Sequence, residues 1–158
     1  MGYERELLFQ NDGYFVSDVS LDGRWVALDR STNCGATPAA PSSCTTCRAA
    51  RTTHVTPHEG DVQFGTVGFT PNSSQLYYST NGEGEFAQVW SYGLTSAERA
   101  AVLQADWDVM YVVFSRRGRY RVSAVNADAQ TEITSSTRAP ARRCLKKRGA
   151  RHIVQAGT

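Results

Sequence analysis

The 158-residue sequence has no long hydrophobic run, and no stretch approaches the roughly 18–20 apolar residues that a membrane-spanning helix needs. Residues 1–6 are acidic, whereas a secretory signal peptide is basic and then apolar. Glu6 also stands where N-myristoylation favours serine or threonine. We therefore expect neither a signal peptide nor a membrane anchor. The compartment stays open, with the cytoplasm slightly favoured.

Two segments lack large apolar side chains. Residues 34–51 contain no Val, Ile, Leu, Phe, Tyr or Trp, and residues 135–151 contain Leu145 alone of these. Such segments cannot bury enough apolar area to offset the conformational entropy that ordering removes. We predict an irregular, disordered insert at about residues 34–51 and a disordered basic tail over residues 135–158.

Lysine and cysteine are scarce and unevenly placed. Both lysines, Lys146 and Lys147, lie in the tail, as does Cys144, and the other three cysteines fall within residues 34–51. Without a secretory signal, these cysteines do not establish disulfides.

Charge is uneven as well. Residues 1–137 hold ten of the seventeen Lys and Arg and all fifteen Asp and Glu, a net charge of −5. Residues 138–158 hold the other seven positive charges and no acid. The tail has no aromatic side chain on which a base could stack. We interpret it as a solvated segment and expect no nucleic-acid or membrane partner.

What the sequence does contain is a recurring turn. Residues 20–25 read SLDGRW between two β-patterned runs, and Asp-Gly in such a place is a strong hairpin signal. Residues 70–75 (TPNSSQ) and 115–120 (SRRGRY) repeat the pattern after 50 and then 45 residues. A self-similar unit of roughly 40–50 residues fits a four-stranded propeller blade. We predict an all-β fold, a partial, open β-propeller of about three blades of four-stranded antiparallel sheet over residues 5–134.

The β-patterned runs define the expected strands. In the first unit we expect strands at residues 7–9, 14–19, 25–29 and 52–56, with no third strand visible in the insert. In the second unit we expect strands at residues 62–69, 76–80, 88–92 and 99–103. Residues 96–104 could instead form a short helix, and we favour a strand because the repeat requires one. In the third unit we expect strands at residues 107–114, 120–126 and 130–134, with no fourth.

Several motifs follow one another in a fixed order, at residues 14–25, 54–60, 69–72, 76–81, 85–86, 105–109, 114–120 and 124–128. They resemble the N-terminal β-propeller of the prolyl-oligopeptidase-type serine peptidases, near the acylaminoacyl-peptidase and dipeptidyl-peptidase branch. The turn of that family is usually Ser-Pro-Asp-Gly. Here Leu21 replaces the proline in the first copy, Asn72-Ser73 replaces Asp-Gly in the second, and Arg116-Arg117 replaces Pro-Asp in the third. The resemblance covers about residues 5–33 and 52–134, and related turns occur in TolB-type propellers.

The resemblance implies a role without chemistry of its own. In this family the propeller caps a separate α/β-hydrolase domain and filters substrates by size. The catalytic triad lies in that hydrolase domain, and this chain has no Gly-x-Ser-x-Gly nucleophile elbow. We expect a non-catalytic propeller fragment whose partners are the missing hydrolase domain and the peptide substrates of the parent enzyme. The alternative is a TolB-like propeller that acts as a protein-binding module.

The two unmatched segments begin abruptly and share an excess of Arg, Ala, Thr, Pro and Cys. We hypothesise that residues 34–51 and 135–158 are out-of-frame translations of a GC-rich coding sequence. Reading the other two frames of the DNA tests this. The hypothesis fails if neither frame restores a Val/Leu/Tyr-rich strand with a hydrolase downstream.

One spacing resembles a metal site. Cys44, Cys47, His54 and His58 give C-x2-C-x6-H-x3-H, and thiolates with imidazoles can hold zinc. The gap of six is shorter than the roughly twelve residues or more of a zinc finger, and it contains no aromatic or leucine for a core. We interpret these residues as loop and turn positions, and we expect no metal and no cofactor. His152 lies in the unpatterned tail.

The remaining polar candidates receive structural interpretations. Five acids are expected in turns, where an aspartate hydrogen-bonds the local backbone: Asp18, Asp22, Asp106, Asp108 and Asp128. The hydroxyls of Ser20, Thr70 and Ser115 hold one position in three turns, so we do not interpret them as nucleophiles. We expect Trp25, Trp90 and Trp107 to pack between blades. No catalytic residue is assigned.

Three blades cannot close a ring, since closure takes at least about four. The inner and outer edges of the blades would then be exposed, which favours association. We expect low stability and self-association through the open blade edges.

Overall fold

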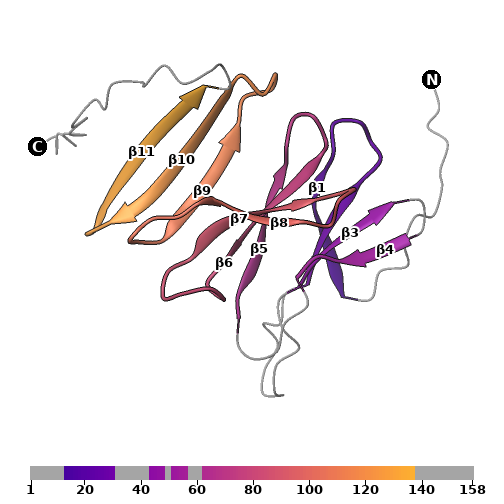
Figure 1. Ribbon diagram of the computed structural model, residues 1–158, viewed down its shortest axis with the longest axis horizontal. Helices are drawn as coiled ribbons and strands as arrows, with labels where there is room; N and C mark the ends of the chain where they lie inside the picture. Colours follow the sequence, from indigo (N-terminus) through magenta and orange to yellow (C-terminus); the bar gives the residue numbers. More distant parts are fainter. Residues whose placement is uncertain (1–12, 31–42, 49–50, 57–61, 138–158) are drawn as a thin grey trace, which may run out of the picture.

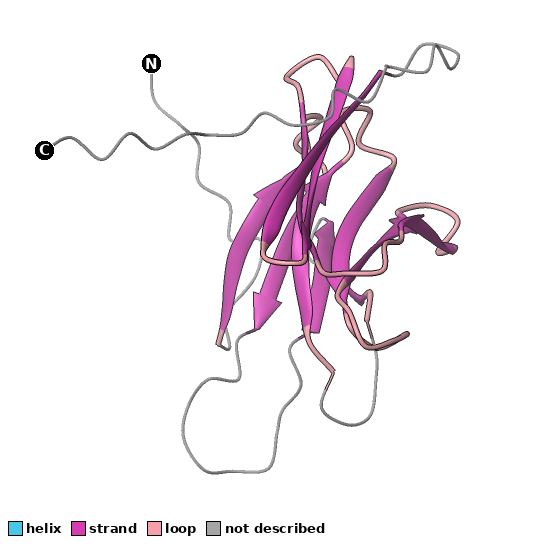
Figure 2. Ribbon diagram, turned by 90° about the vertical axis from the view of Figure 1, so that its left-hand side faces the viewer, coloured by secondary structure: helices cyan, strands magenta, loops and turns pink. Residues whose placement is uncertain are grey.

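The computed structural model describes residues 13–30, 43–48, 51–56 and 62–137, and every regular element among them is a β-strand. The strands form three antiparallel sheets that follow one another along the chain and stand side by side (Figure 1). Figure 2 shows the same strands from the side. The described residues contain no helix, and so none that could cross a membrane.

Each sheet is a meander in which every strand pairs with the next along the chain. The first sheet contains β1 (Tyr14–Val19), β2 (Val26–Arg30), β3 (Ser43–Arg48) and β4 (Arg51–His54). The second contains β5 (Phe64–Phe69), β6 (Gln75–Thr80), β7 (Gln88–Gly93) and β8 (Arg99–Leu103). The third contains β9 (Val109–Phe114), β10 (Tyr120–Ala127) and β11 (Gln130–Thr137).

The predicted repeat of three units is confirmed, and so is the strand at Arg99–Leu103 that competed with a helix. The third sheet has three strands among the described residues, as expected. β11 runs to Thr137, three residues beyond the expected end of the repeat. The strand expected at residues 7–9 lies outside the described residues.

β3 differs from the prediction. Within the segment expected to be an irregular insert, Ser43–Arg48 form the third strand of the first sheet, in a register that pairs Val26 with Cys47 and Arg30 with Ser43. Residues 31–42 lie outside the described residues. The free edge of β2 presents N–H and C=O groups that need partners. A threonine-containing segment can satisfy them without contributing large apolar side chains, and composition alone misses this.

The second sheet is covered on both faces, because β6 sends alternate side chains to opposite neighbours. Leu76 and Tyr78 belong to the core shared with the first sheet, whereas Tyr77 belongs to the core shared with the third. The first core consists of Ala27, Val55, Phe69, Leu76, Tyr78 and Tyr92. The second core consists of Tyr77, Val89, Val109 and Val112. Burial on both faces explains why the second sheet is apolar at consecutive positions.

Two carboxylates join the first sheet to the second. Asp18 on β1 accepts a hydrogen bond from the backbone N–H of Phe69 at 2.7 Å. Asp29 on β2 accepts two from Thr66, at 3.0 Å from the backbone N–H and 2.6 Å from the hydroxyl. Hydrogen bonds to charged groups contribute more than neutral ones, about 1.5–3 kcal/mol. The two carboxylates therefore set the position of β5 against β1 and β2.

The second and third sheets are joined in a similar way. Asp108, directly before β9, accepts a hydrogen bond from the backbone N–H of Ala87 at 2.8 Å. The N–H of Val109 donates to the Ala87 carbonyl, also at 2.8 Å. The Gln88 amide accepts from the Ala105 N–H at 2.7 Å and donates to the Ala105 carbonyl at 3.1 Å. Each junction between sheets thus combines an apolar core with side chains that bond to backbone.

The three recurring turns occupy the same corner of successive sheets, as predicted. Ser20, Thr70 and Ser115 each donate a backbone N–H to the carbonyl of the residue five positions on, at 3.0, 2.9 and 2.9 Å. Their hydroxyls accept from the N–H of that same residue, at 2.9, 3.1 and 2.9 Å. The hydroxyls therefore close turns and are engaged with backbone.

The fourth turn residue is in the left-handed region in all three copies. It is Gly23 (φ 68°), Ser73 (φ 53°) and Gly118 (φ 64°). Neighbouring turns also touch, because a Cβ placed on Gly118 would lie 2.7 Å from Pro71 of the second turn. A Cβ on Gly23 would meet nothing within 4 Å.

These two glycines give a matched prediction. Gly23→Ala should lower the free energy of unfolding by about 1–2 kcal/mol, the cost of a left-handed alanine. Gly118→Ala should lower it by about 1–3 kcal/mol more, because the added methyl also overlaps Pro71. Urea unfolding of both variants measures the difference. Equal losses would contradict the close contact between the second and third turns.

Candidate functional site

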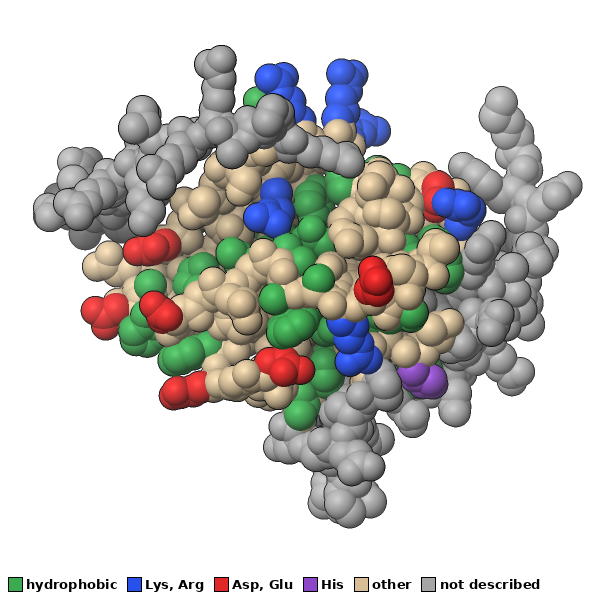
Figure 3. Space-filling model, in the orientation of Figure 1, with side chains coloured by type: hydrophobic (Ala, Val, Ile, Leu, Met, Phe, Trp, Pro, Cys, Tyr) green, Lys and Arg blue, Asp and Glu red, His purple; other side chains and the backbone are tan. Residues whose placement is uncertain are grey.

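Charged side chains are unevenly distributed between the two ends of the inner strands β5 and β9. Four arginines lie in or next to the turn between β9 and β10: Arg116, Arg117, Arg119 and Arg121. We call this corner, with the three recurring turns, the turn end. The loops at the other end of the second and third sheets carry Glu83, Glu85, Asp106, Asp108 and Asp128. Figure 3 shows several basic side chains along the upper edge and a group of acidic ones at the lower left, with further charges of both signs between them.

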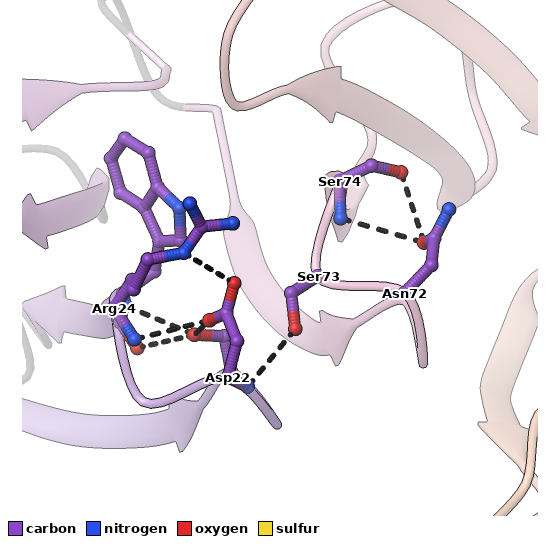
Figure 4. A network of polar contacts seen from close by, with 7 residues as sticks. Asp22, Arg24, Asn72, Ser73 and Ser74 are labelled. Carbon is purple, nitrogen blue, oxygen red and sulfur yellow. Dashed lines mark hydrogen bonds and ion pairs between the residues drawn. The ribbon is translucent and has the colours of Figure 1, made fainter.

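Asp22 organises the first turn (Figure 4). Its carboxylate accepts a hydrogen bond from the Ser20 hydroxyl at 2.7 Å, from the Arg24 backbone N–H at 3.1 Å and from the Arg24 Nε at 2.6 Å. The Asp22 backbone N–H donates to the Ser73 hydroxyl of the second turn at 3.3 Å. In the second turn, Asn72 takes the same role by accepting from Ser74.

These contacts lower the pKa of Asp22 to about 2 from an ordinary value of 3.8. The hydrogen bond from Ser20 is the largest cause, followed by the backbone N–H of Arg24. Partial loss of hydration opposes the shift, and the Arg24 side chain adds to it. The carboxylate is therefore tied into the turn as an acceptor and is not poised as a general acid or base near neutral pH.

A cavity of about 310 Å³ lies at the turn end between the second and third sheets. Tyr77 and Phe114 form an apolar side, with ring centroids 5.2 Å apart and planes at 64°. Arg119 and Arg121 also line the cavity. The other lining residues are Thr70, Pro71, Asn72, Gln75, Gly118, Ser136 and Thr137.

Neither arginine of the cavity has a carboxylate partner in the part of the chain that the structure describes. The ion pair found in that part joins Arg24 to Asp22. The Arg119 guanidinium lies 5.4 Å from the centroid of the Tyr120 ring, a cation–π distance. A guanidinium presents several N–H donors in a planar fork that fits a carboxylate or a phosphate. The cavity thus combines an apolar side with two guanidinium groups that have no carboxylate partner among the described residues.

A second cavity of about 230 Å³ lies at the other end of the second sheet. Phe64, Ser79 and Asn81 line it together with Glu85 and Asp108. Its acids give it the opposite character, and Asp108 is already bonded to Ala87. The first cavity is therefore the stronger candidate for binding a ligand.

The acids singled out in the sequence have different placements. Asp22 is a turn residue as predicted, and Asp128 lies in the turn after β10 with φ 47°. Asp18 and Asp108 instead bridge neighbouring sheets. Asp106 is exposed in the loop before β9. None of these contacts brings the acids together as a catalytic set.

The zinc-like spacing is tested only in part. Cys44 and Cys47 lie in β3, His54 ends β4, and His58 and His152 lie outside the described residues. The described residues contain no group of three His, Cys, Asp or Glu side chains that could hold a metal ion. The interpretation of this motif as structural stays a prediction.

Two of the three tryptophans pack as expected. Trp25 and Trp90 lie against the core between the first and second sheets. The buried Nε1 of Trp90 has no hydrogen-bond partner within the described structure. Trp107 is 42% exposed and contacts Phe86, with ring centroids 5.6 Å apart, so it is less enclosed than predicted.

Sequence reasoning missed the two arginines of the cavity. Their signal was present, because four arginines occur within six residues at 116–121 and no acid occurs between Asp108 and Asp128. It also missed Asp29, whose partner Thr66 is 37 residues away in the sequence. Local patterns do not show such long-range pairs.

Solved structures share this arrangement of sheets. TolB from Acinetobacter baumannii superposes with a TM-score of 0.60 and 13% identity, covering 85% of this chain and 32% of that one. A TolB-type protein from Agrobacterium tumefaciens gives a TM-score of 0.62 and 13% identity, covering 83% and 48%. A structure from a study of two prolyl endopeptidases gives a TM-score of 0.60 and 17% identity, covering 79% and 18%. The fold is that of an open β-propeller.

The chain spans less than half the length of each of these similar structures. No protein-family model matches the sequence, and no curated protein matches it. At 13–17% identity the likeness establishes the fold, and it includes both propeller types that the sequence resembled.

The Asp22 network makes a prediction about pH. Because the folded pKa is lowered, the stabilisation by the carboxylate is present above about pH 4 and is lost as pH falls toward about 2. Ser20→Ala should raise the pKa of Asp22 toward 3.8, because it removes the largest cause of the shift. Carboxyl NMR titration measures this. Ser115→Ala, which removes the matching hydroxyl of the third turn, is the control and should leave Asp22 unchanged.

Proposed function

We propose that this chain is a non-catalytic propeller segment that binds peptide or protein ligands at its turn end. The observation that carries the proposal is the 310 Å³ cavity with two arginines that have no carboxylate partner among the described residues. A cavity with an apolar side and a few convergent polar groups is typical of ligand sites. The groups present suit binding, since no nucleophile and base are paired in the described part of the chain.

The class of ligand follows from the lining. The guanidinium groups favour an anion, and the rings of Tyr77 and Phe114 favour an apolar neighbour to that anion. A peptide that ends in an apolar residue offers both in its terminal carboxylate and last side chain. Such a ligand agrees with a propeller related to the substrate-gating domain of a prolyl-oligopeptidase-like peptidase, which acts on peptides. In this proposal the chain itself does not hydrolyse them.

Calorimetric titration tests the site with a pair of short N-acetylated peptides that end in leucine, one with a free carboxylate and one with a terminal amide. The free acid should bind at least about tenfold more tightly, since a charge-assisted hydrogen bond is lost with the amide. Arg121→Gln should remove this preference. Arg24→Gln, at the first turn and outside the cavity, is the matched control and should keep it.

Equal binding of the two peptides would contradict the carboxylate assignment. Competition by inorganic phosphate at similar concentration, with no apolar contribution, would show a general anion site in its place. Release of p-nitroaniline from prolyl or alanyl p-nitroanilides by the purified chain would contradict the non-catalytic role.

The second candidate is a TolB-like protein-binding module. The two TolB structures support this candidate as much as the prolyl endopeptidase structure supports the peptidase-related one. The DNA downstream of codon 135 separates the two. A frame that encodes Gly-x-Ser-x-Gly in an α/β-hydrolase pattern supports the peptidase relation. Further propeller units without such an elbow support the TolB-like module.

A further inference from the structure

Among the described residues, large exposed apolar side chains are confined to the two outer sheets and the segments next to them. The described residues include ten large apolar side chains that are at least 40% exposed, and all lie in the first or third sheet or in the segments next to them. They are Phe15, Val16, Val19, Leu21, Trp107, Met110, Tyr111, Val113, Tyr120 and Ile133. The second sheet contributes none. The second sheet therefore has its large apolar side chains covered, whereas the first and third sheets leave some of theirs in water.

The outward face of the third sheet follows from strand register. Val112 and Phe114 pack toward the second sheet, so Val113 between them points outward and is 51% exposed. Val113 pairs across the strands with Val122. Ile133, in β11, lies on the same side and is 64% exposed.

The outward face of the first sheet follows in the same way. Asp18 and Ala27 pair across β1 and β2 and both face the second sheet. Val19 and Val26, the next pair, therefore face outward, and Val19 is 50% exposed. This face is also apolar, and its exposed part lies along β1, because Leu28 on β2 is buried whereas Val16 beside it is 62% exposed.

The repeat shows what each outward face is built to contact. Val19 precedes the turn as Phe69 does 50 residues later, and Phe69 is a core residue against the first sheet. Val122 stands 45 residues after Tyr77, which packs against the third sheet. In the second sheet, Phe69 and Tyr77 pack against the two neighbouring sheets. The two outward faces thus carry apolar residues, Val19 and Val122, at the equivalent positions.

We propose that two copies of this chain associate head to tail, the third sheet of each against the first sheet of the other. Two such contacts, related by a twofold axis, close a ring of six sheets. Six lies within the usual four to eight blades of a propeller. In this dimer the contact surfaces are the faces of the sheets, whereas the sequence predicted self-association through the open blade edges.

A second copy fits because it carries both faces in the required order: its first sheet meets the third sheet of the other copy, and its third sheet meets the first. A partner that covers one outward face alone leaves the other in water, whereas ring closure by two copies covers both outward faces. The equivalence also sets which residues meet. Asp18 contacts Phe69 within the chain, and their counterparts at the new contact are Val113 of one copy and Val19 of the other.

Sedimentation equilibrium of the 158-residue chain tests the proposal. The chain should behave as a dimer of twice its 17.3 kDa mass. Val19→Glu and Val113→Lys should each give monomers, because each places an unpaired charge in both contacts of the ring. An equimolar mixture of the two variants should restore the dimer, with one unchanged contact and one in which the new carboxylate faces the new ammonium.

Glu83→Lys, in an exposed loop of the second sheet, is the control and should remain dimeric. Near-ultraviolet circular dichroism confirms that the monomeric variants stay folded, which their half-exposed positions allow. A dimer that Val113→Lys breaks and Val19→Glu leaves intact would indicate pairing of two third sheets and overturn the proposal. A wild-type monomer up to about 100 µM would also overturn it, and would leave both faces for a blade supplied by a longer chain.

Discussion

Burial of both faces of the second sheet is the constraint on which the rest of this structure depends. A twisted antiparallel sheet of four strands that exposed both faces would not be stable in water, and here each face is covered by a neighbour. Apolar packing alone would let the sheets slide, because the hydrophobic effect has no direction. The carboxylates of Asp18, Asp29 and Asp108 supply the direction, since each accepts from a particular backbone N–H of an adjacent sheet or loop.

Much of this architecture could be predicted from the sequence because the repeating turn is local. Its hydroxyl, its bend and its left-handed position lie within six residues, so each copy is recognisable by itself. The second copy was found although Ser73 stands where the others have glycine. That serine keeps the backbone conformation, and its hydroxyl accepts from the Asp22 N–H.

What could not be predicted depends on partners that are distant in sequence. β3 forms beside β2 although its composition suggested a loop, because an existing strand edge provides its hydrogen-bond partners. The cavity depends on the packing of the second sheet against the third, which places Arg119 and Arg121 beside Tyr77. Asp18 was interpreted as a turn acid, but its decisive partner, Phe69, is 51 residues away. Charge pattern and local propensity do not report such pairings.

The uneven distribution of charge between the two ends has a consequence for how the molecule meets others. Among the described residues, the arginines of the β9–β10 turn and the acids of the opposite loops give the second and third sheets an uneven charge along their inner strands, although Glu98 is an acid at the turn end. In the field of a charged surface the molecule experiences a torque before any atoms touch, so its approach is already oriented. This alignment acts over about a Debye length, roughly 8–10 Å at physiological ionic strength, and weakens as salt is added. An anionic ligand would therefore encounter the arginine-lined cavity more often than random collisions predict.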